Sequence, residues 1–230
     1  MTIREKSSYN QSCLGVVLTG GLSSRMGTDK ALLNRHADIN TDTSANSSAT
    51  HENMLSFSTQ QLKNIGLDDV IISGKKHGLA DEFENLGPMG GIYTIFKKYH
   101  PKAMLILPVD LPLIDNESLK QLKRVGELSQ QACFYHDNYL PLYLPITAFV
   151  EQFFEQAFIP FKQAMSSINS SPVKGPSIKA LLAQTPHKGL KPTSTQSLFN
   201  ANTPEQWQQA QQKFQQQVQH PILHNRKNHV

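Results

Sequence analysis

The stretch from Leu14 to Lys30, LGVVLTGGLSSRMGTDK, constrains the fold more than any other part of the sequence. It opens with a short apolar run, too short for a buried helix, that leads directly into Thr19-Gly20-Gly21. This pattern predicts a buried β-strand ending in a tight turn. Because glycine backbone can approach a ligand closely, its N–H groups can face phosphate oxygens, and Arg25 and Lys30 add positive charge. The stretch therefore predicts an anion site at the edge of a sheet.

Two common glycine-rich loops do not fit this stretch. A P-loop places lysine directly after its second conserved glycine, whereas Thr28 and Asp29 separate Gly27 from Lys30. The glycines also do not follow the G-x-G-x-x-G spacing of the dinucleotide fingerprint. An ordinary β-turn with charges placed by chance remains an alternative, which the spacing of Arg25 and Lys30 disfavours.

Composition limits the class of protein. The chain has 230 residues, a formal net charge of +4 and a pI near 9.0. This charge suits an anionic partner, but it is diffuse, without the basic stripe and interleaved aromatic residues of a nucleic-acid-binding protein. A polyphosphate ligand explains it equally well, and we expect no binding to nucleic acid. Cys13 and Cys133 form no disulfide framework or zinc pattern. With no membrane span and no signal peptide in the sequence, we expect a cytoplasmic monomer that does not bind membranes.

The length suits one domain. We expect a single domain over 14–218, with flexible ends at 1–13 and 219–230. The segment 34–52 is polar, with Ile39 as its only large apolar residue, so it cannot bury enough surface to offset the entropy of ordering. We interpret it as an inserted surface loop, either padding or a recognition lid.

Hydrophobic periodicity predicts an α/β fold with parallel strands. A strand, a helix and a second strand over 14–18, 54–65 and 70–73 form a βαβ unit. Further helices are expected over 92–99, 116–128, 149–161 and 177–183 and from Pro204, with a strand over 104–109, a hairpin over 132–144, and loops over 166–176 and 185–197. The last helix should begin with a capping box formed by Thr203 and Gln206.

Asp110 follows the apolar run Met104–Val109 and is flanked by Pro108 and Pro112. The run predicts a central strand whose end presents the carboxylate at the ligand-binding edge of the sheet. A carboxylate oxygen is a hard ligand that suits Mg²⁺, which a triphosphate substrate needs for charge neutralisation. The alternative, based on turn chemistry alone, is that Asp110 is a turn or helix-capping residue.

Four motifs resemble those of the molybdenum cofactor guanylyltransferases, the MobA family. The glycine-rich stretch resembles L-x-G-G-x-S-x-R-M-G-x-D-K, Gly87-Pro88-Met89-Gly90-Gly91 resembles G-P-L-x-G, Val109-Asp110-Leu111-Pro112 resembles C-D-x-P, and Phe199–Glu205 resembles F-x-N-x-N-T-P-E-D-L. The motifs occur in the family's order. The resemblance implies a three-layer Rossmann-like nucleotidyltransferase fold with a mostly parallel central sheet.

The resemblance also implies roles for individual residues. Arg25, Lys30 and Asp110 would be catalytic, with Asp110 also holding Mg²⁺, and Asn200 and Asn202 would face a pterin. The residues implied in GTP binding are Leu18, Thr19, Gly20, Gly21, Lys30, Asp81, Gly87, Pro88, Gly91 and Asp110. Ser73 is a further candidate for GTP binding on its position alone, because it ends the predicted strand over 70–73, at the edge where open α/β sheets bind ligands. A carboxylate can accept from guanine N1–H and N2–H₂ together, so Asp81 is the candidate that reads the base, with Glu82 and Glu84 as alternatives.

The implied reaction joins GTP to molybdopterin, or Mo-molybdopterin, giving the guanine dinucleotide cofactor and pyrophosphate. Molybdenum insertion proteins and molybdoenzyme chaperones are then candidate partners. Three alternatives stay open. A molybdopterin cytidylyltransferase would read L-A-A-G where this chain has Leu18-Thr19-Gly20-Gly21, and a sugar-1-phosphate nucleotidyltransferase would not need Asn200 and Asn202. A catalytically silent nucleotide-binding or adaptor protein would not need Arg25, Lys30 and Asp110.

Overall fold

The structure is a computed structural model that describes residues 13–19, 28–35, 52–164 and 175–219. The predictions for Gly20, Gly21 and Arg25, for most of the 34–52 insertion and for the two chain ends lie outside the described residues. The statements below concern the described ranges.

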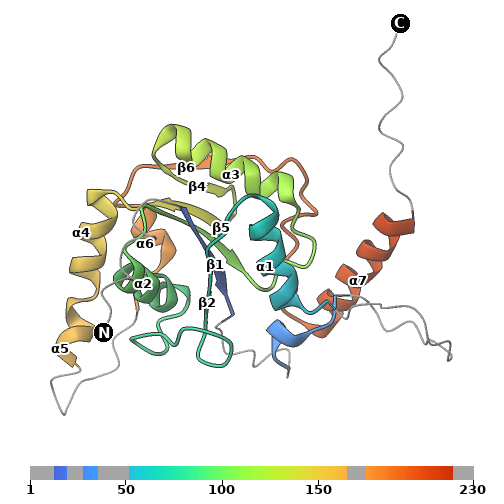
Figure 1. The fold of residues 1–230 in the computed structure, drawn as a ribbon, viewed down its shortest axis with the longest axis horizontal. Coiled ribbons are helices and arrows are strands. Elements are labelled where there is room, and N and C mark those ends of the chain that lie inside the picture. Colours follow the sequence, from blue (N-terminus) through green and yellow to red (C-terminus); the bar gives the residue numbers. More distant parts are fainter. Residues whose placement is uncertain (1–12, 20–27, 36–51, 165–174, 220–230) are drawn as a thin grey trace, which may run out of the picture.

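A six-stranded sheet runs through the molecule (Figure 1). Its strand order is β2-β1-β3-β5-β4-β6, and β5 is antiparallel to both of its neighbours while all other neighbouring strands are parallel. The strands are β1 (Cys13–Leu18), β2 (Val70–Ser73), β3 (Ala103–Pro108), β4 (Ala132–Tyr135), β5 (Asn138–Pro145) and β6 (His187–Leu190). The mostly parallel α/β sheet is therefore confirmed.

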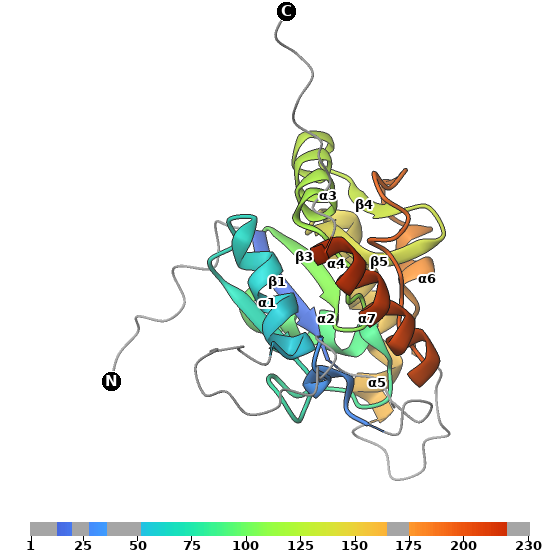
Figure 2. The ribbon, with the colours of Figure 1, turned by 90° about the vertical axis from the view of Figure 1, so that its right-hand side faces the viewer.

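Helices cover both faces of the sheet (Figures 1 and 2). One layer contains α1 (Met54–Asn64), α3 (Asn116–Ser129) and α7 (Pro204–Gln219), and the other contains α2 (Pro88–Tyr99), α4 (Ala148–Ala157), α5 (Ile159–Ala164) and α6 (Ile178–Leu182). Side chains alternate along β1, so Val16 lies in one core cluster and Val17 in the other. This is the three-layer arrangement that the resemblance to the MobA family implies. Within the described ranges no helix is both long and apolar enough to cross a membrane.

Predicted capping residues begin and end several helices. The Asp115 carboxylate accepts a hydrogen bond from the N–H of Ser118 at 2.7 Å and begins α3. Gly66, just after α1, has φ +83°, the left-handed conformation expected after a helix. Thr203 and Gln206 form the predicted capping box, with distances of 3.3 Å from Gln206 N to Thr203 Oγ1 and 3.2 Å from Thr203 N to Gln206 Oε1.

Two predictions of local structure were wrong. The single helix expected over 149–161 is divided into α4 and α5 at Phe158, because Pro160 has no N–H to continue the helical hydrogen bonds. The loop expected over 185–197 contains β6, whose sequence His-Lys-Gly-Leu has no strand pattern. This edge strand is formed by its parallel pairing with β4, which local propensity does not reveal.

The register of the sheet brings three strand ends together. Leu18 at the end of β1 pairs with Ser73 at the end of β2 and with Pro108 at the end of β3. The residues that follow these strands, among them Thr19 and Asp110, therefore share one edge of the sheet. The short 3-10 helix η2 (Lys30–Leu32) lies near the same edge, next to the start of α7.

Candidate active site

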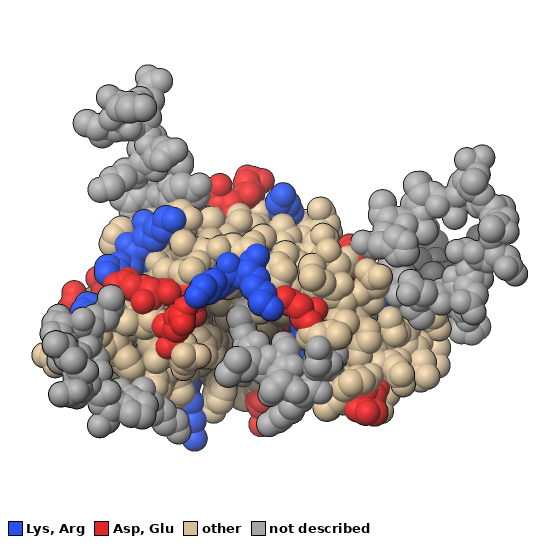
Figure 3. Space-filling view, turned by 90° about the horizontal axis from the view of Figure 1, so that it is seen from below, with Lys and Arg blue, Asp and Glu red and all other residues tan. Residues whose placement is uncertain are grey.

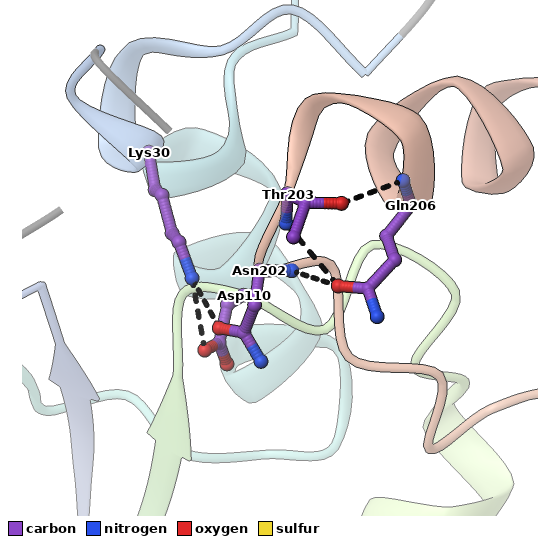
Figure 4. A network of polar contacts seen from close by, with 5 residues as sticks. All are labelled: Lys30, Asp110, Asn202, Thr203 and Gln206. Atoms are coloured by element: carbon purple, nitrogen blue, oxygen red, sulfur yellow. Dashed lines mark hydrogen bonds and ion pairs between the residues drawn. The ribbon is translucent and has the colours of Figure 1, made fainter. Parts of the chain in front are cut away.

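Three predicted site residues from distant parts of the chain meet at this edge (Figure 4). The Lys30 ammonium donates to the side-chain oxygen of Asn202 at 2.6 Å and lies 3.4 Å from Asp110 Oδ2. Lys30 comes from η2, Asp110 from the loop after β3, and Asn202 from the segment before α7. The side chains of Lys30 and Asp110 are 16% and 20% exposed, so both are shielded but reachable.

Backbone hydrogen bonds hold the segments of this cluster in place. The N–H of Val109 donates to the carbonyl of Leu18 at 3.1 Å, which extends the β1–β3 pairing up to Asp110. The N–H of Ala201 donates to the carbonyl of Asp110 at 3.0 Å, and the N–H of Asn202 donates to Gln206 Oε1 at 2.8 Å. The Asp110 loop and the Asn202 segment are therefore attached to each other directly.

The chemistry of Asp110 fits a bound cation. Its Oδ1 atom is buried and has no hydrogen-bond partner within the described ranges, while its Oδ2 atom faces Lys30. Among the described residues, His, Cys, Asp and Glu side chains form no group of three that could hold a metal by themselves. A single carboxylate suits Mg²⁺, which commonly binds one or two protein carboxylates together with substrate phosphates and water.

The residue before Lys30 is also held firmly. Asp29 accepts from the N–H of Ala31 at 3.1 Å and is 2.9 Å from His77 Nε2, in the loop after β2. Partial burial alone would raise the pKa of Asp29, but the hydrogen bonds from His77 and Ala31 and the charges of His77 and Lys76 together lower it. Sequence reasoning missed this link, because nothing near His77 in the sequence indicates a partner in the Lys30 segment.

A second cluster lies where β2 ends and α2 begins. Ser73 Oγ donates to Asp81 Oδ1 at 3.3 Å. A Cβ atom on Gly91 would overlap Ser73 Oγ, and a Cβ on Gly90 would lie 2.9 Å from Asp81 Oδ2. Because only glycine lacks this atom, Gly90 and Gly91 allow the Asp81 carboxylate to lie against the first turn of α2.

The neighbouring acidic residues have other partners. Glu82 pairs with Lys97 at 2.6 Å and Glu84 pairs with Lys75 at 2.9 Å, both on the surface. Asp81 instead faces Ser73, and burial raises its pKa above the usual value, with the charge of Glu84 adding to this and the Ser73 hydrogen bond opposing it. Of the three acids, Asp81 is thus the one placed at the strand-end edge.

Thr19 attaches the end of β1 to the second cluster. Both its N–H and its hydroxyl donate to the carbonyl of Ser73, at 2.9 and 2.7 Å. The side chain of Leu18 is 6% exposed and packs in the core, and its carbonyl accepts a hydrogen bond from the N–H of Val109.

The remaining predicted residues lie around these clusters. Gly87 caps α2 with φ +61° and ψ −151°, a backbone conformation suited to glycine, and Pro88 begins the helix. Asn200 is exposed and makes no side-chain hydrogen bond within the described ranges, so the structure separates it from the Lys30 contact that Asn202 makes.

A groove of about 560 Å³ lies elsewhere, between the β4–β5 hairpin, α6 and β6. Its lining includes Phe134, His136, Tyr139, Lys179 and His187, and none of the predicted site residues. On the face seen in Figure 3, basic side chains (blue) and acidic side chains (red) lie close together, and the basic ones form no continuous patch. On this face the charges are therefore mixed in sign.

Comparison with solved structures defines the class. The fold is similar to that of a molybdopterin-guanine dinucleotide biosynthesis protein A from Archaeoglobus fulgidus, with a TM-score of 0.62, 15% identity, and coverage of 88% of this chain and 98% of the other. It is also similar to a nucleotidyl transferase from Methanothermobacter thermautotrophicus, with a TM-score of 0.61, 12% identity, and coverage of 89% and 98%. The fold is that of the Rossmann-like nucleotidyltransferases.

Sequence comparison then identifies the family. The profile of the MobA-like NTP transferase domain matches residues 15–157. A molybdenum cofactor guanylyltransferase of Xanthomonas euvesicatoria is 30% identical over 200 residues, which cover 84% of this chain and 91% of that protein. A probable molybdenum cofactor guanylyltransferase of Methanothermobacter thermautotrophicus is 30% identical over 117 residues, covering 51% of this chain and 59% of that protein. The chain belongs to the MobA-like NTP transferase family and is a nucleotidyltransferase.

Proposed function

We propose that this nucleotidyltransferase transfers GMP from GTP to molybdopterin or Mo-molybdopterin, forming the guanine dinucleotide cofactor and releasing pyrophosphate. The observation that carries this proposal is the contact of Lys30 with both Asp110 and Asn202, which come from distant parts of the sequence. One cation is thereby shared between the edge expected to bind the triphosphate and the segment expected to face the pterin. The Xanthomonas relative is named a molybdenum cofactor guanylyltransferase, which supports the proposal.

In this proposal the nucleotide binds along the ends of β1, β2 and β3. Asp81, beside Gly91 and Ser73, accepts from guanine N1–H and N2–H₂. The glycines and Arg25 of the first loop, with Lys30, bind the phosphates. The start of α2 at Gly87 and Pro88 borders the base, and Asn200 and Asn202 offer amide groups to the pterin.

The chemical step needs no protein nucleophile. A phosphate oxygen of molybdopterin forms a bond to the α-phosphorus of GTP, and the bond from this phosphorus to the bridging oxygen of the β-phosphate breaks. Pyrophosphate leaves with the electron pair of that bond. Because the attacking oxygen is already negative, catalysis consists of positioning and charge stabilisation, and Lys30 stabilises the charge that develops around the α-phosphate.

Asp110 would hold Mg²⁺, which neutralises the charge of the triphosphate. Its unpartnered Oδ1 atom is the position from which the ion would be bound. Asp110 Oδ2 is paired with Lys30. This pairing keeps the carboxylate oriented and keeps the ammonium beside the phosphate site.

The test offers purified protein a panel of GTP, CTP, ATP and UTP with molybdopterin and Mg²⁺, and measures the product by mass and the release of pyrophosphate. The expected result is pterin-dependent consumption of GTP alone. A cytidine product would identify a cytidylyltransferase instead. Turnover that requires a sugar 1-phosphate and no pterin, or the absence of turnover with every acceptor, would overturn the proposal.

A further inference from the structure

Arg35 lies between two aromatic rings from opposite ends of the chain. Its guanidinium carbon is 3.8 Å from the ring centroid of Phe57, in α1, and 4.0 Å from that of Phe214, in α7. The side chain is 14% exposed. A planar guanidinium can stack on a ring with each of its two faces, and an arginine shielded from water in this way gains more from each contact than an exposed one.

Polar contacts fix the same guanidinium within its plane. Arg35 Nε donates to the carbonyl of Pro112 at 3.0 Å, and Nη1 lies 3.5 Å from Glu52 Oε2. Nearby on α7, Gln211 Nε2 donates to the carbonyl of Asn34 at 3.2 Å. Gln211 and Phe214 are three positions apart and so lie on one face of α7, and both attach this helix to the segment that follows η2.

Among the described residues, α7 buries few side chains. The helix is rich in glutamine, and Ala210 is the only fully buried residue in its described part, 204–216. Trp207 packs partly against the core. Since helices are stabilised in proteins mainly by packing an apolar face, the contacts of Phe214 and Gln211 form a large share of what holds α7 in place.

The three segments that Arg35 joins are those that supply the candidate active site. Lys30 lies shortly before Arg35 in the chain, Asp110 shortly before Pro112, and Asn202 just before the helix that bears Phe214. We propose that Arg35 is a positioning residue that holds α7 against the other two segments and thereby sets the contact between Lys30 and Asn202. Its effect on turnover rests on the proposed function, since it concerns how Asn202 meets the second substrate.

Arginine is required for this role because lysine cannot reproduce it. The ammonium of lysine is a point charge, without a plane that can stack on Phe57 and Phe214 while donating sideways to Pro112. Burial lowers the pKa of Arg35, with Glu52 opposing the shift, but arginine starts so high that it stays charged. Arg35→Lys therefore keeps the positive charge but removes the planar group that stacks on the two rings and donates to Pro112.

The first test measures kinetics of Arg35→Lys, with Arg124→Lys as the control, because Arg124 is exposed on α3 and undergoes the same chemical change. In Arg35→Lys we expect the KM for molybdopterin to rise about tenfold, while the KM for GTP stays within about twofold of the parent value, too small a change in free energy to report a lost contact. In an Asn202→Ala background the same substitution should add little, because both changes act through one contact. Equal losses for both substrates, or additive losses in the double variant, would overturn the inference.

The second test needs no substrate. Amide hydrogen exchange should become faster at Ala201 and Asn202 in Arg35→Lys but not in Arg124→Lys, with the amides of β3 unchanged in both. Phe214→Leu removes one ring and keeps the arginine, and it should also make amide exchange faster at Ala201 and Asn202. This variant replaces Arg35→Lys in the test if Arg35→Lys does not fold. Unchanged exchange at Ala201 in both variants would overturn the inference. Because exchange is measured without substrate, it decides the positioning role even if the parent protein proves inactive with molybdopterin.

Discussion

Two regions share the edge of the sheet at which β1, β2 and β3 end, and they are built differently. Where β1, β3 and α7 meet, the site is made of charge, with Lys30 bonded to Asp110 and Asn202. Where β2 meets α2, the site depends on glycine, because Gly91 has no side chain and so packs directly against Ser73 and Asp81. The first region can exchange its internal ion pair for contacts with a charged ligand. The second has a fixed shape and suits recognition of a planar group.

This difference predicts that the two regions affect different properties of the enzyme, the charged region its turnover and the glycine-lined region its choice of nucleotide. If the proposed function holds, a change to the charged region should reduce turnover with every nucleotide, because it removes charge stabilisation at the proposed phosphate site. A change to the glycine-lined region should alter the choice of nucleotide or the stability of the fold. The following variants test this division in order of decreasing effect.

Lys30→Ala should have the largest effect. By analogy with the loss of one donor to a developing oxyanion, the activation barrier should rise by about 2.7–4 kcal/mol, a loss of about 10²- to 10³-fold in kcat. Steady-state pyrophosphate release measures it, and Lys63→Ala, at an exposed position near the end of α1, is the control. Near-normal turnover by folded Lys30→Ala would contradict the mechanism.

Asp81→Asn should act on nucleotide binding. It removes the charged acceptor that the proposed function assigns to guanine, and a hydrogen bond to a charged group contributes about 1.5–3 kcal/mol. Affinity for GTP should fall accordingly while that for CTP changes little, measured by calorimetry, with Glu84→Gln, which removes a surface pair with Lys75, as the control. An equal loss for both nucleotides would remove Asp81 from base recognition.

The same residue predicts a pH dependence. Burial raises the pKa of Asp81 in the free protein, and only the ionised carboxylate accepts from both guanine donors. Affinity for GTP should therefore be highest above this pKa and fall as the pH decreases through it, starting at a higher pH than for an ordinary aspartate. In Asp81→Asn this decrease should be absent, and its persistence would assign it to another group.

Gly91→Ala should destabilise the fold. The added Cβ overlaps Ser73 Oγ, and overpacking of this kind costs about 1–3 kcal/mol. The free energy of unfolding in urea measures the loss. Since the clash involves the Ser73 hydroxyl, Ser73→Ala combined with Gly91→Ala should recover part of the stability, and a purely additive double variant would contradict the packing explanation.

Thr19→Val should have the smallest effect. It removes the hydroxyl that donates to the carbonyl of Ser73, a contribution of about 0.5–1.5 kcal/mol, and the low end is expected because the Thr19 N–H still donates to the same carbonyl. Thr147→Val is a matched control, since Thr147 Oγ1 is buried without a partner in the described ranges and its removal should not destabilise. Equal losses at both positions would mean that the Thr19 hydrogen bond contributes nothing specific.

Local patterns predicted much of the architecture. The apolar run of β1, the Gly66 and Asp115 caps and the Thr203–Gln206 capping box all arise from residues a few positions apart, so they could be found without the structure. The division of the helix expected over 149–161 into α4 and α5 was not predicted, although Pro160 indicates a break, because the phenylalanine-rich periodicity continues through the proline. The strand β6 could not be found, since only its pairing with β4 forms it.

The sequence by itself determined the class of fold, the order of the motifs and the candidate residues Lys30, Asp110 and Asn202. It could not determine that these residues touch, because Lys30 and Asn202 are 172 positions apart. Nor could it determine that Thr19 bonds to the end of β2, or that Arg35 lies between Phe57 and Phe214. Such contacts depend on strand register and helix docking, which follow from packing of the whole chain rather than from any local preference.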